Sequence, residues 1–207
     1  MRASFGIALV FFVVVSVASA GVIPLIDASF ENPSCGAPGT SCAPVSGSWV
    51  VSGSANQWNP TAGQYSSIPD GTQVAWANTG GSLTQTTATA LALNTTYTLS
   101  VAVGLRDNDT FTFGGVVELL AGSTVLGTAS GATPTLGNWD TWTLVYNSGS
   151  SNALAGQDLA IELMSTTNQT GFDDVTLNQA SGVPEPAMFA LVGVGLLGLV
   201  ARRRFAK

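Results

Sequence analysis

The side chains available for catalysis set the first limit on what this chain can do. Its 207 residues include no histidine, so neither a Ser-His-Asp or Cys-His arrangement nor a histidine-ligated zinc site can form. Chemistry would depend on carboxylates, for instance a glycosidase pair formed by Glu118 and Glu162. Both glutamates interrupt alternating apolar runs, VVELL and LAIEL, as a solvent-facing residue of a strand does. We therefore expect a non-enzymatic protein and keep a carboxylate glycosidase as the least favoured alternative.

The charged residues divide sharply between the ends of the chain and its middle. Five of the 6 basic residues belong to the terminal segments: Arg2, Arg202, Arg203, Arg204 and Lys207. The segment from Gly21 to Gly182 contains all of the 12 acids except Glu185, and Arg106 is the single base in it. Such a surface repels phosphate backbones, which bind chiefly to Lys and Arg, so nucleic acid is excluded as a partner and anionic lipid is disfavoured.

The first 20 residues have the layout of a secretory signal peptide. Arg2 precedes an apolar stretch from Phe5 to Val17, and Ala18-Ser19-Ala20 supplies an A-x-A cleavage site. We expect a signal helix over residues 1–20 that is removed, so that the mature chain begins near Gly21.

A second apolar run near the C-terminus predicts a short transmembrane helix over residues 187–201. Its 15 residues would cover about 22 Å of a hydrocarbon core about 30 Å thick, and snorkelling arginines could supply part of the difference. Arg202, Arg203 and Arg204 follow the run and stop translocation, which leaves them in the cytoplasm and the preceding domain outside.

The residues just before this run complete a recognisable signal. Val183, Pro184, Glu185 and Pro186, the glycine-rich apolar span and the arginine cluster together resemble the PEP-CTERM sorting signal, over residues 183–207. The resemblance implies a Gram-negative, exopolysaccharide-producing bacterium, with single-pass anchoring in the inner membrane. It also implies an exosortase as partner, cleavage near the Pro-Glu-Pro, and delivery to the cell surface or extracellular matrix.

The two cysteines, Cys35 and Cys42, lie in a loop rich in Pro, Gly and Ser. In an exported protein this setting favours a disulfide between them, and the alternative is a free reactive thiol.

The segment between the two signals, residues 21–182, has the pattern of an all-β domain. Residues 97–105 alternate apolar with small or polar side chains, and residues 142–146 and 159–163 repeat the alternation. About nine or ten strands separated by turn clusters predict a two-sheet antiparallel jelly-roll sandwich. The shorter strands are expected at 22–26, 49–52, 74–77, 82–87, 116–120, 124–128 and 175–177.

Three pieces of this domain, LIDASFENP, DGTQVAWANTGGSLTQT and GFDDVTL, resemble in their order the galactose-binding-like jelly-roll carbohydrate-binding modules. The resemblance implies a structural Ca2+ ion held by Glu31 with Asp173 or Asp174. Carboxylate oxygens are the ligands that calcium prefers, and the alternative is that these acids are simply solvated.

Aromatic rings that stack on sugars must stand on an exposed face or loop. Trp58 and Tyr65 occur in the polar segment QWNPTAGQYSSIPDG, which has no apolar alternation to bury them, and Trp139 is a third candidate. Tyr97, Trp76 and Trp142 fall in strand patterns and are expected in the core. The sequence thus predicts an exported surface protein that contacts extracellular polysaccharide, with a purely structural component of the biofilm matrix as the alternative.

Overall fold

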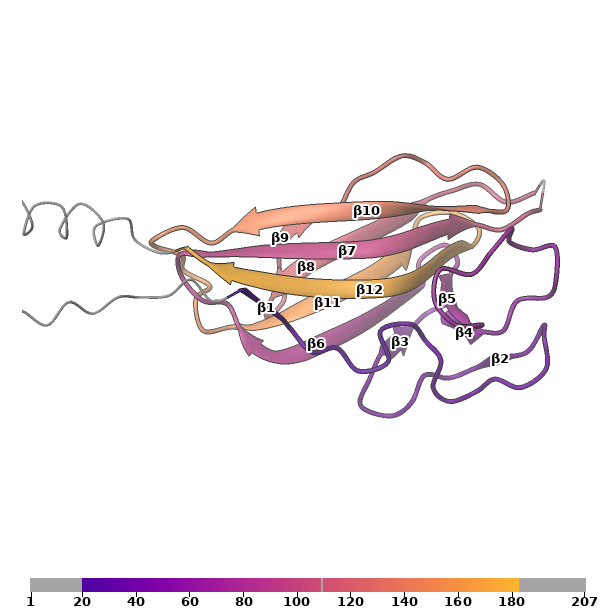
Figure 1. Ribbon diagram of the computed structural model, residues 1–207, viewed down its shortest axis with the longest axis horizontal. Coiled ribbons are helices and arrows are strands. Elements are labelled where there is room, and N and C mark those ends of the chain that lie inside the picture. The colour runs from indigo at the N-terminus through magenta and orange to yellow at the C-terminus, as the bar shows by residue number, and fades with distance from the viewer. Residues whose placement is uncertain (1–19, 109, 183–207) are drawn as a thin grey trace, which may run out of the picture. The chain divides into compact units, whose positions relative to one another are not determined.

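The computed structural model describes residues 20–108 and 110–182, which form a sandwich of two antiparallel sheets (Figure 1). The predicted signal helix, sorting motif and transmembrane segment 187–201 lie outside these residues. Within them, no helix is long and apolar enough to cross a membrane. Residues 20–181 belong to one compact unit.

The larger sheet, sheet A, has seven strands within the described residues. Its hydrogen-bonded order is β10 (Asn138–Asn147), β7 (Thr95–Leu105), β12 (Thr170–Ser181), β5 (Val74–Ala77), β4 (Ala55–Trp58) and β2 (Ser41–Cys42). The remaining strand, β1 (Ala20–Val22), pairs with the end of β12.

The second sheet, sheet B, has five strands within the same residues. Their order is β3 (Val50–Ser52), β6 (Ser82–Ala90), β11 (Asp158–Ser165), β8 (Gly115–Ala121) and β9 (Thr124–Thr128). The two-sheet antiparallel prediction is therefore confirmed, and the predicted bounds of β5 and β9 coincide with those of the structure.

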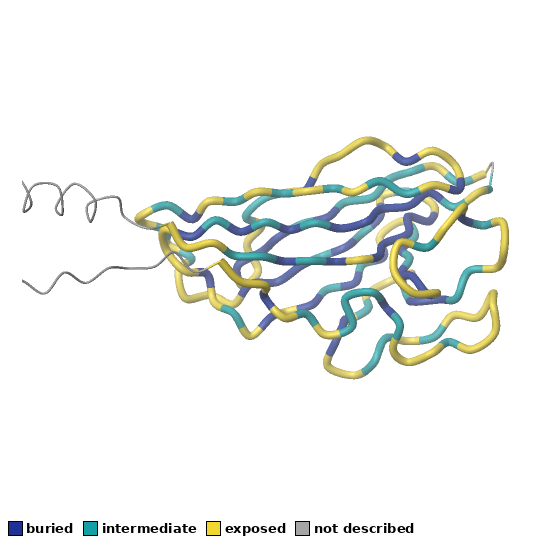
Figure 2. Tube along the Cα trace, viewed as in Figure 1, coloured by how far each residue is buried: buried dark blue, intermediate teal, exposed yellow. Residues whose placement is uncertain are grey.

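The core lies between the sheets because alternate residues of each strand point inward. Tyr97, Leu99, Val101 and Val103 of β7 are fully buried and belong to one cluster with inward-facing residues of sheet B, among them Leu83, Ile161 and Leu163. Figure 2 shows the buried residues concentrated along the strands, while the exposed ones gather in the loops. Sheet A consequently has an outer face, directed away from sheet B, on which the other set of residues stands.

Candidate functional site

On the outer face of sheet A, two glycines lie side by side where β7 and β12 are paired, next to Trp139 of β10. The strand register places Trp139 opposite Gly104, and Gly104 opposite Gly171. A Cβ at Gly104 would lie 2.7 Å from the ring of Trp139, and one at Gly171 would lie 2.5 Å from the hydroxyl of Tyr65. The two glycines therefore let the aromatic rings lie directly on the backbone of the sheet.

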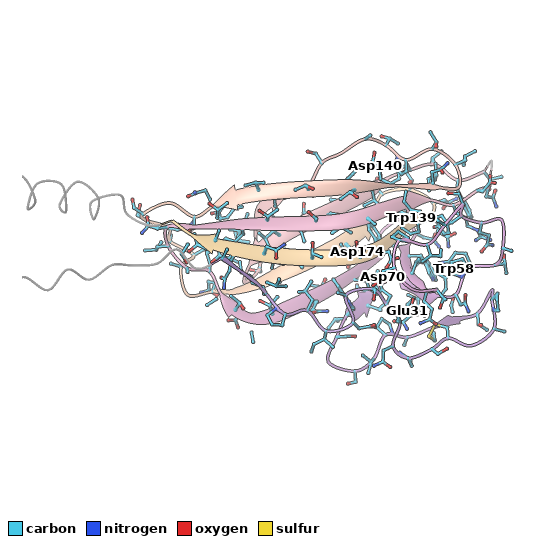
Figure 3. The ribbon with its side chains drawn as sticks, in the orientation of Figure 1. Glu31, Trp58, Asp70, Trp139, Asp140 and Asp174 are labelled. Atoms are coloured by element: carbon cyan, nitrogen blue, oxygen red, sulfur yellow. A yellow bond between two sulfur atoms is a disulfide. The ribbon has the colours of Figure 1, made fainter. Side chains whose placement is uncertain are left out.

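Trp139 and Tyr65 belong to a small hydrophobic cluster separate from the main core. We call it the aromatic cluster; its buried members are Trp58, Tyr65 and Val74, with Ile68, Trp76 and Trp139 packed against them. The rings of Tyr65 and Trp139 lie 4.6 Å apart between centroids. Figure 3 shows Trp58 and Trp139 at the end of the sandwich that also holds Glu31 and Asp70.

The loop over residues 59–73, which joins β4 to β5, covers this cluster. Its backbone is fastened to distant segments: Ser66 N donates to Gly137 O (2.7 Å), and Trp139 Nε1 donates to Ser67 O (2.9 Å). As a result, Trp58 is only 5% exposed and Tyr65 only 8% exposed. The prediction that these two rings are exposed to solvent is therefore wrong. The loop lacks apolar alternation, but its hydrogen bonds to distant segments hold it over the rings and bury them.

Several polar atoms in the aromatic cluster are buried without a hydrogen-bond partner. Among the described residues they are Trp58 Nε1 and the Tyr65 hydroxyl, together with Nε of Arg106, which packs on the cluster. Such atoms normally cost about 1–3 kcal/mol each when left unpaired, and native proteins keep few of them. Burial also raises the pKa of the Tyr65 phenol well above its usual range, so this hydroxyl keeps its proton and remains a donor.

Arg106 follows β7 directly and supplies the positive charge of this region. Its guanidinium lies over the ring of Trp58, 4.9 Å from the centroid, and 5.4 Å from that of Phe111. Its Nη1 donates to Gln169 Oε1 at 3.0 Å. The sequence marked Arg106 as the single base of the domain but gave it no role; its isolation in an acidic chain was the available signal.

Two of the acids predicted to bind calcium, Glu31 and Asp173, hold the end of the covering loop. Asp173 Oδ2 accepts from Asp70 N (3.0 Å) and Oδ1 from Asp174 N (2.8 Å). Glu31 Oε1 accepts from the backbone of Thr72 and Gln73, at 2.7 and 2.6 Å. Across residues 20–108 and 110–182, no group of three or more acids, histidines or cysteines is placed to hold a metal ion. Calcium at Glu31, Asp173 and Asp174 stays a prediction.

Asp173 stands on the outer face of β12, opposite Ala102 and two positions after Gly171. It is fully buried, and this burial raises the pKa of its carboxyl from 3.8 to about 8, with the charges of Asp70 and Asp174 acting in the same direction against two backbone hydrogen bonds. Next to it Asp174 has a positive φ of 44° at a register shift in β12. Burial thus favours the protonated form of the Asp173 carboxyl.

The structure also describes the two remaining pairs from the sequence analysis, the cysteines and the two glutamates. Cys35 and Cys42 are joined by a disulfide with an S–S distance of 2.00 Å. Glu118 and Glu162 face each other directly across β8 and β11 on the outer side of sheet B. A hollow beside them is lined by Glu162, Met164 and Ser165.

Comparison with known proteins identifies the class to which the sandwich belongs. Residues 21–178 match the model of the HpiC1-like family, described as HpiC1 cyclase, and the chain belongs to this family. Residues 182–204 match the PEP-CTERM protein-sorting motif, which implies an exported protein that an exosortase processes. No curated protein matches the chain.

Solved structures resemble the domain to different degrees. The Stig cyclase Fisc from Fischerella sp. TAU, in complex with (3Z)-3-(1-methyl-2-pyrrolidinylidene)-3H-indole, shares 25% identity at a TM-score of 0.71, over 80% of this chain and 100% of that one. A second cyclase from Fischerella sp. TAU shares 26% identity at a TM-score of 0.69, over 80% and 100% of the two chains. The CBM22-1 xylan-binding domain of Paenibacillus barcinonensis Xyn10C shares 15% at a TM-score of 0.50, over 81% and 100%, a likeness in fold alone. The predicted kinship with carbohydrate-binding modules is thus weaker than that with the cyclases.

Proposed function

We propose that the exported domain is a non-catalytic binding module for ring-shaped ligands, in the first place sugars of the extracellular polysaccharide. Trp58, Tyr65 and Trp139 form its binding surface on the outer face of sheet A. The observation that carries the proposal is the set of buried, unpaired polar atoms within the aromatic cluster. A ligand that brought hydrogen-bond acceptors to these donors would remove their cost.

The chemistry of the cluster suits a sugar because a pyranose ring has an apolar face and a polar edge. The face would lie on the aromatic rings, and the hydroxyl oxygens at the edge would accept from Trp58 Nε1 and the Tyr65 hydroxyl. Since both rings are more than nine-tenths buried, the 59–73 loop has to move for a ligand to reach them. Binding would therefore be coupled to the opening of this loop.

The sorting motif indicates that the domain is exported, to a place where it can meet polysaccharide. We propose that the chain is first held in the inner membrane of a Gram-negative bacterium by residues 187–201, with the domain outside. An exosortase then releases it to the cell surface or matrix, where polysaccharide is abundant. The motif itself says nothing about what the domain binds.

A pair of matched substitutions tests the binding surface. Trp58→Phe keeps a ring in the cluster but removes the unpaired indole N–H, whereas Trp142→Phe removes an indole N–H that already donates to Ala132 O at 2.8 Å. In a screen of residues 21–182 against a polysaccharide panel, we expect Trp58→Phe to weaken binding about tenfold and Trp142→Phe to leave it unchanged. If the folded wild-type domain binds no glycan, the alternative of a purely structural matrix protein replaces the proposal.

A second function, acid catalysis of ring closure, is favoured by one specific observation. The buried carboxyl of Asp173 keeps its proton near neutral pH and stands on the same sheet face as the aromatic rings. A proton donor next to rings that stabilise cations is what an acid-catalysed cyclisation needs, and relatives of this domain are called cyclases.

This second function can be separated from binding with a compound seen on a relative. A cyclase from Fischerella sp. TAU has been solved with 4-(1H-indol-3-yl)butan-2-one. Incubation of the domain with this ketone in D2O, followed by mass spectrometry, would reveal carbon-bound deuterium or a cyclised product if catalysis occurs. Loss of that product in Asp173→Asn would support catalysis, whereas an unchanged ketone would leave the binding module as the function.

Calcium at Glu31, Asp173 and Asp174 is a separate proposal with its own test. Calorimetric titration of the chelator-treated domain with CaCl2 should give a binding heat that Glu31→Gln abolishes. Absence of any heat from the wild-type domain would overturn it.

A further inference from the structure

The one basic residue of the exported domain is placed where a cation is expensive to keep. Arg106 packs against the rings of Trp58 and Phe111, and its Nε is buried without a hydrogen-bond partner. A guanidinium has five N–H donors and retains its charge under all physiological conditions. Within the described part of the chain its Nη1 donates to Gln169, which is a neutral acceptor. The protein thus provides the ring contacts of this cation but leaves donors for something else.

The acidic composition of the domain makes this arrangement specific. Ten of the eleven acids between Gly21 and Gly182 lie in the described residues, 20–108 and 110–182, where Arg106 donates to the amide of Gln169. The Tyr65 hydroxyl is close enough for the charge of Arg106 to act on its pKa, and this hydroxyl is also buried and unpaired. The Tyr65 hydroxyl and the indole N–H of Trp58, within the aromatic cluster, and the guanidinium of Arg106, packed on it, therefore present unpaired donors at one place.

We propose that these donors bind the carboxylate of an acidic sugar, so that the domain selects uronic acid residues within its polysaccharide. This inference rests on the proposed function and names the ligand class of the same surface. The planar guanidinium fork matches a carboxylate through two parallel hydrogen bonds, and the Tyr65 hydroxyl can donate to one of its oxygens. The sugar ring attached to the carboxylate would lie against Trp58 or Trp139.

The net charge of the domain restricts the ligand further. With eleven acids against one base, the surface repels a chain that is charged at every residue, while one carboxylate seated on Arg106 meets its counter-ion at short range. The preferred ligand is accordingly a mostly neutral polysaccharide with isolated uronic acid residues.

The test compares two ligands that differ only in whether one sugar carries a carboxylate or a neutral hydroxymethyl group. One is a neutral oligosaccharide that carries a single glucuronate, and the other is the same molecule after reduction of the carboxylate to an alcohol. For the wild-type domain at 0.1 M salt we expect the acidic form to bind at least tenfold more tightly. In Arg106→Gln this preference should disappear, so that the acidic and the reduced form bind with equal affinity.

The outcomes separate the inference from the function on which it rests. If the wild-type domain binds both forms equally, or Arg106→Gln keeps the preference, acid selection is overturned and sugar binding stands. If neither form nor any neutral glycan binds, the proposed function itself fails. Arg106→Lys keeps the charge but not the fork, and we expect an intermediate preference; this variant replaces Arg106→Gln if the latter does not fold.

Discussion

The outer face of sheet A has two halves that differ in whether their polar side-chain atoms have hydrogen-bond partners. Toward the β1 end, Thr98, Ser100 and Thr143 stand in reach of solvent, and the hydroxyls of Ser100 and Thr143 lie 3.3 Å apart, within hydrogen-bond distance. Toward the β4 end, the hydroxyl of Tyr65 and the indole N–H of Trp58 are buried and unpaired. We call these the hydroxyl half and the aromatic half.

This difference shows where the molecule departs from the most stable arrangement. Polar atoms in the hydroxyl half exchange bonds with each other and with water at little cost, whereas those in the aromatic half are desolvated without compensation. Since a single strand pair, β7 and β10, contributes to both halves, the contrast is not a property of a particular strand. It points to a requirement other than stability in the aromatic half.

The largest expected effect comes from removing a ring of the aromatic half. Trp58→Ala should lower the free energy of unfolding by about 3 kcal/mol, the usual cost of emptying a buried aromatic site, and abolish glycan binding. Urea denaturation and the glycan screen measure the two effects. Val145→Ala, on the exposed part of β10, is the control and should change neither. Full affinity in folded Trp58→Ala would contradict the assignment of the surface.

The next effect is a pH dependence that originates at the buried acid of this face. Because the folded pKa of Asp173, about 8, exceeds its ordinary value of 3.8, the folded state holds a proton that the unfolded chain releases. Stability should therefore fall as the pH rises from about 4 to 8 and level off above, since the unfolded chain releases this proton at lower pH than the folded domain does.

Asp173→Asn should flatten this profile when unfolding is measured in EDTA between pH 4 and 9. Asp27, whose pKa burial also raises, is unchanged by the substitution and leaves a smaller slope of the same sign. Identical profiles for the variant and the wild type would show that Asp173 is ionised in the folded protein.

A smaller effect is expected at Tyr65, where a substitution should raise the stability of the domain rather than lower it. Tyr65→Phe removes a buried hydroxyl that has no partner, so the domain should become about 1 kcal/mol more stable. Glycan affinity should nevertheless fall, by about tenfold, because the ligand loses a donor. Thermal unfolding and titration of the same sample measure both quantities. A less stable Tyr65→Phe would mean that the hydroxyl is already satisfied in the free protein.

The smallest effects belong to the hydroxyl half. Thr98→Ala and Thr143→Ala remove side chains that contact solvent, and each should alter stability by less than about 0.5 kcal/mol. Neither should change glycan affinity. A loss of binding in either variant, detected in the same screen, would move the binding surface to this half and remove the contrast between the two.

The sequence predicted the fold well where one face of a strand is apolar. Residues 97–105 alternate cleanly because the inward side chains of β7 meet sheet B, and the predicted strand lies within the observed one. Strand β4 was missed because its sequence, ANQW, turns Gln57 inward rather than an apolar residue. Gln57 is buried there through its hydrogen bond to Pro33 O (2.9 Å), a partner that no local pattern reveals.

The three aromatic residues chosen from the sequence lie together in the structure, but their burial was not predicted. Trp58, Tyr65 and Trp139 were singled out together, and all three lie in the aromatic cluster. Their burial depends on contacts between the 59–73 loop and residues some seventy positions away, such as Ser66 with Gly137. The contribution of Arg106 and the buried state of Asp173 depend on the same closure, so periodicity and composition could not supply them.

The most direct measurement of the central claim is the indole N–H spectrum of the 15N-labelled domain during titration with the glucuronate-bearing oligosaccharide. The indole N–H groups of Trp49, Trp139 and Trp142 donate to the carbonyls of Asp27, Ser67 and Ala132, whereas that of Trp58 has no acceptor. We predict that the Trp58 resonance shifts most, as it gains an acceptor, and that those of Trp49 and Trp142 stay in place. A bound ligand that leaves the Trp58 resonance unmoved would contradict the claim that the aromatic half is the binding surface.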